Sequence, residues 1–313
     1  MPDRPRHWRL PDGVLGMAAR GPEWAAWVDA LPSLVRGLLD EWRLDVDGWL
    51  MHGNTAVVVP VTQESGTPLV LKVGFPDDES EHEPLALQRW GGDGAVRLVT
   101  ADPHRRAMLL ERLHPHETLR TVSVDEACEV VAGLYRRLHV PAPPQLRTLP
   151  SYVEGWSAAL RRLPPGAPIP RRLVEQTLAL SASFVADPGS SGTLVHTDLH
   201  YDNVLAAERE PWLVIDPKPM SGDPHFEPAP MLWNRWPEVA ARGSVRAAVR
   251  RRFHALVDAA GLDEHRARDW VVVRMVHNAH WTVQEALAAD RRLSAEAQEW
   301  ITTALTIAKA VQD

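Results

Sequence analysis

Residues 193–218 read TLVHTDLHYDNVLAAEREPWLVIDPK, and this stretch decides the fold. Apolar runs alternate with polar turns, which predicts a strand, a polar loop, two short strands joined by a turn, and a second polar loop. The first loop carries Asp198 and Asn203, and the second carries Asp216 directly after the apolar run WLVI. Because a β-hairpin can bring two such loops together, we expect these three side chains to lie close to one another.

The combination of these three side chains is typical of phosphoryl transfer. Asn203 and Asp216 offer oxygen ligands of the kind that Mg²⁺ prefers. Asp198 could then accept a proton from a substrate hydroxyl, and phosphoryl transfer requires this division of roles. Each residue alone would more often be a turn former. Their presence together at two strand ends favours a catalytic site.

Two histidines in the same stretch leave a second interpretation open. His196 and His200 flank Asp198 and alternate with it, as metal ligands on a strand can, which would suit a metal-dependent hydrolase. However, no third nitrogen or sulfur ligand lies nearby in the sequence to complete a tetrahedral zinc set. We therefore expect both histidines to hold the loop through hydrogen bonds to the backbone. Asp202 has no assigned role.

The first third of the chain is predicted to be mainly β. Strands are predicted at 48–53, 55–62, 68–74, 95–102 and 106–113, with helices at 22–42 and 80–90. Pro32 is expected to break the first helix or to start a new one. Lys72 lies in the apolar strand PLVLKVG, where an unpaired charge would be costly. Of the acidic residues Glu79, Glu81 and Glu83 that follow, we expect Glu83 to be its partner.

The remainder of the chain is predicted to be mainly helical, at 123–139, 151–163, 170–187, 244–260, 264–289 and 294–311. The predicted fold class is α+β, with a β-rich lobe at residues 1–113 and a helical lobe at residues 114–313. A lysine, a helix glutamate, the strand MLLERL, an Asp…Asn pair and a last Asp follow one another along the chain. This is the order of parts in a bilobal protein-kinase-like fold.

The chain resembles the aminoglycoside phosphotransferases, in particular the branch of streptomycin 6-phosphotransferases and hydroxyurea phosphotransferases. The resemblance rests on four segments and extends over nearly the whole chain. The segments are HTDLHYDNVLAAEREPWLVIDPKPMSGDP (196–224), VLKVGFPDDE (70–79), RWGGDGAVRLV (89–99) and LLERL (109–113).

This resemblance implies roles for individual residues. Asp198 would be the catalytic base, Asn203 and Asp216 would hold Mg²⁺, and Lys72, paired with Glu83, would contact the phosphates of ATP, with GTP as the alternative nucleotide. Backbone groups at Glu111, Arg112 and Leu113 would meet the adenine, and Gly53, Asn54 and Thr55 would cover the phosphates. The chain departs from protein kinases in having no G-x-G-x-x-G, which the family commonly tolerates. It departs from the family pattern in two ways, with Thr197 where Gly is commoner and Glu227 where Asp is usual.

The acceptor is predicted to be recognised by the helical lobe. Asn278, Trp281 and Glu285 follow one another at helical spacing within 275–290, and an aromatic face with a carboxylate could bind a polyamine or a guanidinium group. Glu227 joins them as a candidate substrate residue. The alternative is a surface helix whose Trp packs inward. The resemblance favours the streptomycin 6-hydroxyl as the acceptor, and hence antibiotic resistance, with hydroxyurea or another amino sugar as alternatives.

Composition excludes several other classes of protein. The formal net charge is −7, so the chain lacks the basic excess that nucleic-acid binding needs. Cys128 is the only cysteine, which rules out an intrachain disulfide and a cysteine zinc cluster. No apolar run is long enough for a signal peptide or a membrane span. We therefore expect a cytoplasmic monomer that acts on a small, cationic molecule. A silent nucleotide-binding module is the remaining alternative.

Overall fold

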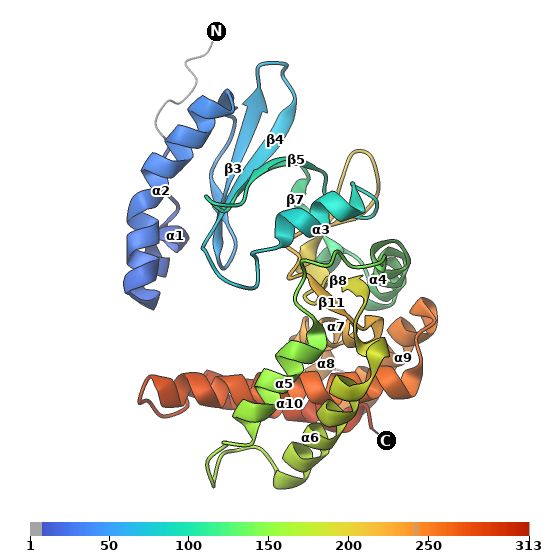
Figure 1. Ribbon diagram of the computed structural model, residues 1–313. Helices are drawn as coiled ribbons and strands as arrows, with labels where there is room; N and C mark the ends of the chain where they lie inside the picture. The colour runs from blue at the N-terminus through green and yellow to red at the C-terminus, as the bar shows by residue number, and fades with distance from the viewer. Residues whose placement is uncertain (1–7, 242, 313) are drawn as a thin grey trace. The chain divides into compact units, whose positions relative to one another are not determined.

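The structure is a computed structural model that describes residues 8–241 and 243–312 (Figure 1). Residues 1–7 lie outside this range. The predicted N-terminal lobe starts within them, and so does the segment in which no signal peptide was expected. The described residues form two units. The first runs to Pro115 and also takes in Ala206–Leu213, and the second comprises His116–Leu205 and the chain from Val214 onward. Segment 206–213 belongs to the first unit, where the guanidinium group of Arg209 forms an ion pair with the carboxylate of Glu111.

The first unit is built on an antiparallel sheet. Its strands are β1 (Leu44–Val46), β2 (Met51–His52), β3 (Ala56–Gln63), β4 (Pro68–Gly74), β5 (Leu98–Asp102) and β6 (Ala107–Glu111). The strand order is β1-β3-β4-β6-β5, and β2 pairs with β3. Strand β2 covers only Met51 and His52 of the strand predicted at 48–53, and Gly48 has a φ of 157°, which favours glycine. Strand β1 was not predicted.

The core of the first unit lies between this sheet and the N-terminal helices α1 (Asp12–Gly16) and α2 (Pro22–Glu41), joined by the 3₁₀ turn η1 (Met17–Arg20) (Figure 1). Leu31, Val35 and Leu38 recur at helical spacing on α2 and are fully buried. The predicted break at Pro32 is wrong, because α2 runs through this residue without interruption. Packing of the apolar face on both sides of Pro32 holds the helix together.

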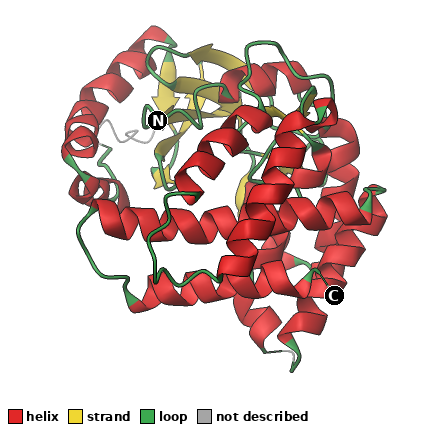
Figure 2. Ribbon diagram, turned by 60° about the horizontal axis from the view of Figure 1, so that its bottom comes forward, coloured by secondary structure: helices red, strands yellow, loops and turns green. Residues whose placement is uncertain are grey.

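The second unit is mainly helical, as Figure 2 shows by colour. Its helices are α4 (Val124–Leu138), α5 (Leu149–Leu160), α6 (Arg171–Ala186), α7 (Ala229–Trp233), α8 (Trp236–Ala240), α9 (Val245–Ala260), α10 (Glu264–Ala288) and α11 (Ala295–Ala310). Helix α10 packs against α6 and α11, and α4 packs against α9. The six long helices were predicted, but α7 and α8 were not. None of the described helices combines the length and the apolar character that a membrane crossing requires.

Short strands interrupt these helices where the decisive stretch lies. Strand β8 (Thr193–Val195) pairs with β11 (Met220–Gly222), and β9 (Val204–Ala206) lies between β10 (Leu213–Val214) and β7 (His114–Thr118). The strand–loop–strand pattern predicted for 193–218 is thus present. The loops after β8 and after β10 carry the predicted catalytic residues.

Candidate active site

The loop after β8 presents Asp198 and Asn203. Thr197 has a φ of 62°, a left-handed conformation that turns the chain sharply before Asp198. The Asp198 side chain is 31% exposed. The Asn203 Nδ2 donates to the Asp198 carbonyl at 2.8 Å. This bond fixes the amide so that its Oδ1, which accepts no hydrogen bond from a described residue, is available to a ligand.

Asp216 lies beside this loop. The Ile215 N–H donates to the Asn203 carbonyl at 2.9 Å, so the residue after Ile215 is held next to Asn203. Asp216 itself has a φ of 56°, and its side chain is 35% exposed. The predicted convergence of the two loops is therefore confirmed by the backbone pairing. The amide oxygen of Asn203 and the carboxylate of Asp216 are oxygen donors of the kind that Mg²⁺ prefers, so the residues fit this metal.

The two histidines hold the loop, as predicted. His196 is fully buried, its Nε2 lies 3.0 Å from the Ile215 carbonyl, and its Nδ1 accepts from the Asp198 N–H at 3.3 Å. Burial lowers the pKa of His196, which keeps the ring neutral. His200 accepts from the Asp202 N–H at 3.2 Å. Within residues 8–241 and 243–312, no three His, Cys, Asp or Glu side chains gather into a metal-holding group, which disfavours the zinc-hydrolase alternative.

Glu227 lies beneath the loop, although it was expected to contact the substrate. Its side chain has no exposed surface, and its Oε1 accepts hydrogen bonds from the N–H groups of His196 and, at 3.3 Å, Thr197. Burial alone would raise the pKa of Glu227, but His139 and His196 outweigh it and the pKa is lowered. The buried carboxylate therefore anchors the backbone that leads to Asp198. Burial separates it from any substrate.

Asp202 and Tyr201, which had no predicted role, fasten the other end of the loop. Asp202 accepts from Arg120 through both carboxylate oxygens, at 2.5 and 2.8 Å. The Tyr201 ring is fully buried beneath the guanidinium groups of Arg235 and Arg252. These contacts stabilise the short 3₁₀ turn η4 (Tyr201–Asn203) that carries Asn203. Nothing in the local sequence indicates them, because Arg120 lies 82 residues away.

In the first unit, the predicted pair of Lys72 and Glu83 is present. The Lys72 Nζ lies 2.6 and 2.7 Å from the two carboxylate oxygens of Glu83, whose side chain is 3% exposed. Alternation along β4 buries Leu71 and Val73 in the core and turns Lys72 to the opposite face of the sheet. Glu83 opens helix α3 (Glu83–Trp90). Two short, charge-assisted bonds fix the ammonium group in place.

In the predicted nucleotide segments of the first unit, several backbone and side-chain groups make structural contacts. In the hairpin 52–56, the Gly53 N–H bonds to the Ala56 carbonyl at 3.0 Å, and the carbonyls of Asn54 and Thr55 accept from Arg20 and from the Phe75 N–H.

Residues 111–113, which were predicted to meet the adenine, also make structural contacts. The Glu111 carboxylate binds Arg209 and the Arg97 N–H, and Arg112 donates to the carbonyls of Leu69 and Val61. Leu113 is buried. The Glu111 N–H also bonds to the Arg97 carbonyl at 3.0 Å. An adenine contact through the backbone of 111–113 stays a prediction. Arg209 was missed, because 98 residues separate it from Glu111.

The predicted acceptor residues on α10 differ in exposure. Asn278 is buried, Trp281 is half-buried, and Glu285 is exposed. The Trp281 ring packs edge-to-face on Trp156 of α5, with centroids 5.0 Å apart at 82°, and Tyr152 extends this cluster. The structure therefore leaves part of an aromatic surface open beside α10. A cation can bind such a surface.

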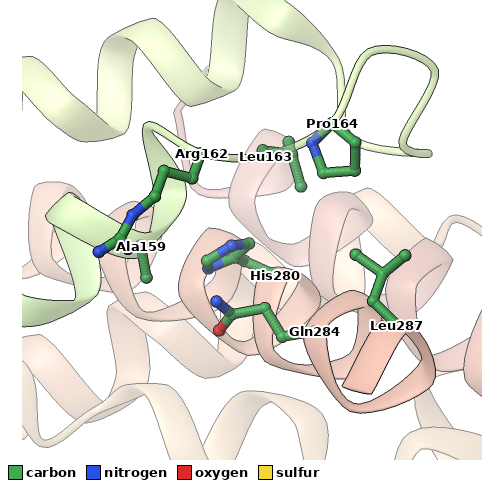
Figure 3. Close-up of a pocket in the computed structure, with 7 residues that line it drawn as sticks. All are labelled: Ala159, Arg162, Leu163, Pro164, His280, Gln284 and Leu287. Carbon is green, nitrogen blue, oxygen red and sulfur yellow. The ribbon is translucent and has the colours of Figure 1, made fainter. Parts of the chain in front are cut away.

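A cavity of about 210 Å³ lies farther along α10. Figure 3 shows His280, Gln284 and Leu287 from α10 opposite Arg162 and Leu163. None of the predicted acceptor residues lines it. The guanidinium of Arg162 makes this wall cationic, so the cavity does not suit a cationic acceptor.

Comparison with known proteins decides the family. Residues 41–286 match the model of the aminoglycoside/hydroxyurea antibiotic resistance kinases. The chain belongs to this family. It is a small-molecule kinase, and the activity fits the pattern of Asp198, Asn203 and Asp216.

Relatives of the kinase support the assignment. It is 42% identical over 291 residues to a streptomycin 6-kinase of Streptomyces griseus, covering 90% of this chain and 94% of the relative. It is 42% identical over 271 residues to a hydroxyurea phosphotransferase of Kitasatospora aureofaciens, covering 84% and 76%. Among solved structures, spectinomycin phosphotransferase in complex with ADP and spectinomycin aligns with a TM-score of 0.62 at 16% identity, covering 90% of this chain and 98% of that one. The protein-kinase-like fold is thus confirmed.

Proposed function

We propose that this kinase transfers the γ-phosphoryl group of ATP to a hydroxyl group of a small cationic acceptor, and that streptomycin is the first acceptor to test. The observation that carries the proposal is the pairing of the two loops that hold Asp198, Asn203 and Asp216. The ADP bound to spectinomycin phosphotransferase supports an adenine nucleotide, with GTP as the alternative. We expect the kinase to act in the cytoplasm, where ATP is available. A monomer is the default expectation.

Each residue then has a defined task. Asp198, fixed by the backbone bonds of its loop, orients the acceptor hydroxyl and accepts its proton. Mg²⁺, held by Asn203 and Asp216, would supply charge neutralisation for the nucleotide phosphates. Lys72, oriented by Glu83, neutralises the α- and β-phosphates. Asn54 and Thr55 of the hairpin 52–56 cover the phosphates, and backbone groups of 111–113 bind the adenine. Positioning and charge neutralisation supply the rate, since phosphoryl transfer leaves little covalent work for the protein.

Acceptor recognition is assigned to the aromatic surface of α5 and α10. Trp281 and Trp156, each partly exposed, offer aromatic surface to a guanidinium or ammonium group, and Glu285 adds an exposed carboxylate. Identity to a streptomycin 6-kinase supports streptomycin, whose guanidinium groups suit this surface. Equal identity to a hydroxyurea phosphotransferase keeps hydroxyurea as the second candidate.

Asp198→Asn tests the catalytic assignment. We expect the variant to lose about 10³-fold in kcat, because an amide cannot accept the hydroxyl proton. Affinity for MgATP, measured by titration calorimetry, should stay within about twofold. Asp258→Asn, an exposed change on α9, is the matched control and should keep full activity. ADP release is measured with streptomycin, hydroxyurea and amino sugars as acceptors. Nucleotide binding without ADP release from any acceptor would show a silent module and contradict the proposal.

A further inference from the structure

Lys218 lies two residues beyond Asp216 and has no role in the scheme above. The chain has three lysines, Lys72, Lys218 and Lys309. The backbone of Lys218 is tied to the catalytic loop on both sides. Its N–H donates to the His196 carbonyl at 3.0 Å, and its carbonyl accepts from the Thr197 Oγ1 at 2.7 Å. Lys218 is therefore held at a fixed position beside the residue that precedes Asp198.

The ammonium group of Lys218 faces Asp216. Its Nζ lies 3.4 Å from the Asp216 Oδ1, and its side chain is 15% exposed. This contact is long compared with the Lys72–Glu83 contacts of 2.6 and 2.7 Å. Charge-assisted hydrogen bonds of this type are commonly 2.7–2.9 Å, so the pairing of Lys218 with Asp216 is loose.

A divalent cation on Asp216 would weaken this loose pairing further. Both positive groups would compete for one carboxylate, and like charges at such separation repel each other. A largely buried ammonium needs an anion in place of the carboxylate, because an unpaired buried charge is costly. In a phosphoryl-transfer site, the anion that approaches the metal-holding carboxylate is the terminal phosphate of the nucleotide.

We propose that Lys218 is a further catalytic residue, whose ammonium group leaves Asp216 and donates to the phosphoryl group that is transferred. This inference rests on the proposed function. Thr197 takes part as a positioning residue, since its left-handed backbone and its hydroxyl hold the Lys218 carbonyl. In the absence of nucleotide, Asp216 keeps the charge of Lys218 neutralised.

Covalent labelling tests the position of Lys218 without relying on turnover. An acyl phosphate of ATP carries its acyl group on the γ-phosphate. An amine nearby attacks the acyl carbon, an amide forms, ATP leaves, and the amine loses a proton. With only three lysines, mass spectrometry assigns the product directly. We expect label on Lys72 and Lys218 that excess MgATP suppresses, and no such label on Lys309, which is exposed on α11. Suppressible label on Lys72 alone would overturn the role of Lys218 and leave the proposed function intact. Suppressible label on neither would overturn both.

Nucleotide affinity provides the second test. Lys218→Met should weaken MgATP binding about tenfold and leave MgADP binding unchanged, because only ATP carries the phosphoryl group that Lys218 contacts. The kcat should fall about 100-fold, and Lys218→Arg should restore part of it. Lys309→Met is the matched control. A structural role would weaken both nucleotides equally and lower the melting temperature, and that result would overturn the proposal.

Discussion

At the scale of single residues, His277 is a buried titratable group whose ring contacts are aromatic. It is fully buried, neither ring nitrogen has a hydrogen-bond partner among the residues that the structure describes, and its ring lies 5.6 Å from that of Trp156. Burial, with a smaller effect from the charge of His280, lowers the pKa of His277 to about 3. The folded protein therefore holds this ring neutral at pH values where the unfolded chain takes up a proton.

The sign of the resulting pH dependence follows. Above a pH of about 6.5, near the pKa of histidine in the unfolded chain, His277 is neutral in both states and its burial does not make the free energy of unfolding depend on pH. As the pH falls from there toward 3, the unfolded chain binds a proton that the folded chain does not, and stability is lost progressively. At pH 5 the loss should be roughly 2 kcal/mol. We expect His277→Leu to remove this part of the acid sensitivity, measured as the free energy of urea unfolding at pH 7 and pH 5. His265→Leu, an exposed change on the same helix, is the control. Equal pH sensitivity in wild type and His277→Leu would contradict the prediction.

Residue pairs close in the sequence could be predicted, and distant ones could not. The pairing of Lys72 with Glu83 followed from the cost of a charge in an apolar strand, and the partner lies only 11 residues away. The partners of Asp202 and Glu227 lie 82 and 31 residues away. Local sequence contains no information about such contacts, because the fold as a whole brings the residues together. For this reason the sequence placed Glu227 at the substrate, whereas the structure buries it under the backbone of His196.

At the scale of elements, hydrophobic periodicity predicted the long helices and the main strands. It missed several elements that are polar or only a few residues long. Strand β7 consists of HPHET, which shows no apolar alternation, and α7 and α8 have five residues each. These elements form because neighbouring parts of the fold satisfy their backbone groups.

Helix α2 yields a prediction at this scale. Pro32 lies inside the helix, where it supplies no N–H and crowds the preceding turn. The buried face of Leu31, Val35 and Leu38 keeps the helix continuous against this cost. We therefore expect Pro32→Ala to raise the free energy of unfolding by about 1–3 kcal/mol, measured by urea denaturation. Pro22→Ala is the control, because proline at the first helical position costs little and its removal should not stabilise the protein. A loss of stability in Pro32→Ala would mean that the fold requires a proline at this position.

At the scale of the whole molecule, charge bears on the choice of acceptor. The net charge of −7 attracts cations over distances that shrink with salt, from about 30 Å at 0.01 M to about 8 Å at 0.15 M ionic strength. A cationic acceptor such as streptomycin should therefore lose kcat/KM by roughly threefold across this range. A neutral acceptor such as hydroxyurea should be nearly unaffected.

The measurement must separate the acceptor from the nucleotide, since MgATP is itself charged. With MgATP saturating at every salt concentration, kcat/KM for the acceptor reports only the encounter of acceptor and enzyme. Glu285→Gln removes one exposed carboxylate beside Trp281 and should reduce the salt dependence for streptomycin, whereas Glu299→Gln on α11 removes the same charge elsewhere. If both variants reduce it equally, the net charge of the chain attracts the acceptor. If Glu285→Gln alone reduces it, the cation binds beside α10. A salt-independent kcat/KM for streptomycin would contradict both, and would make a neutral acceptor the better candidate.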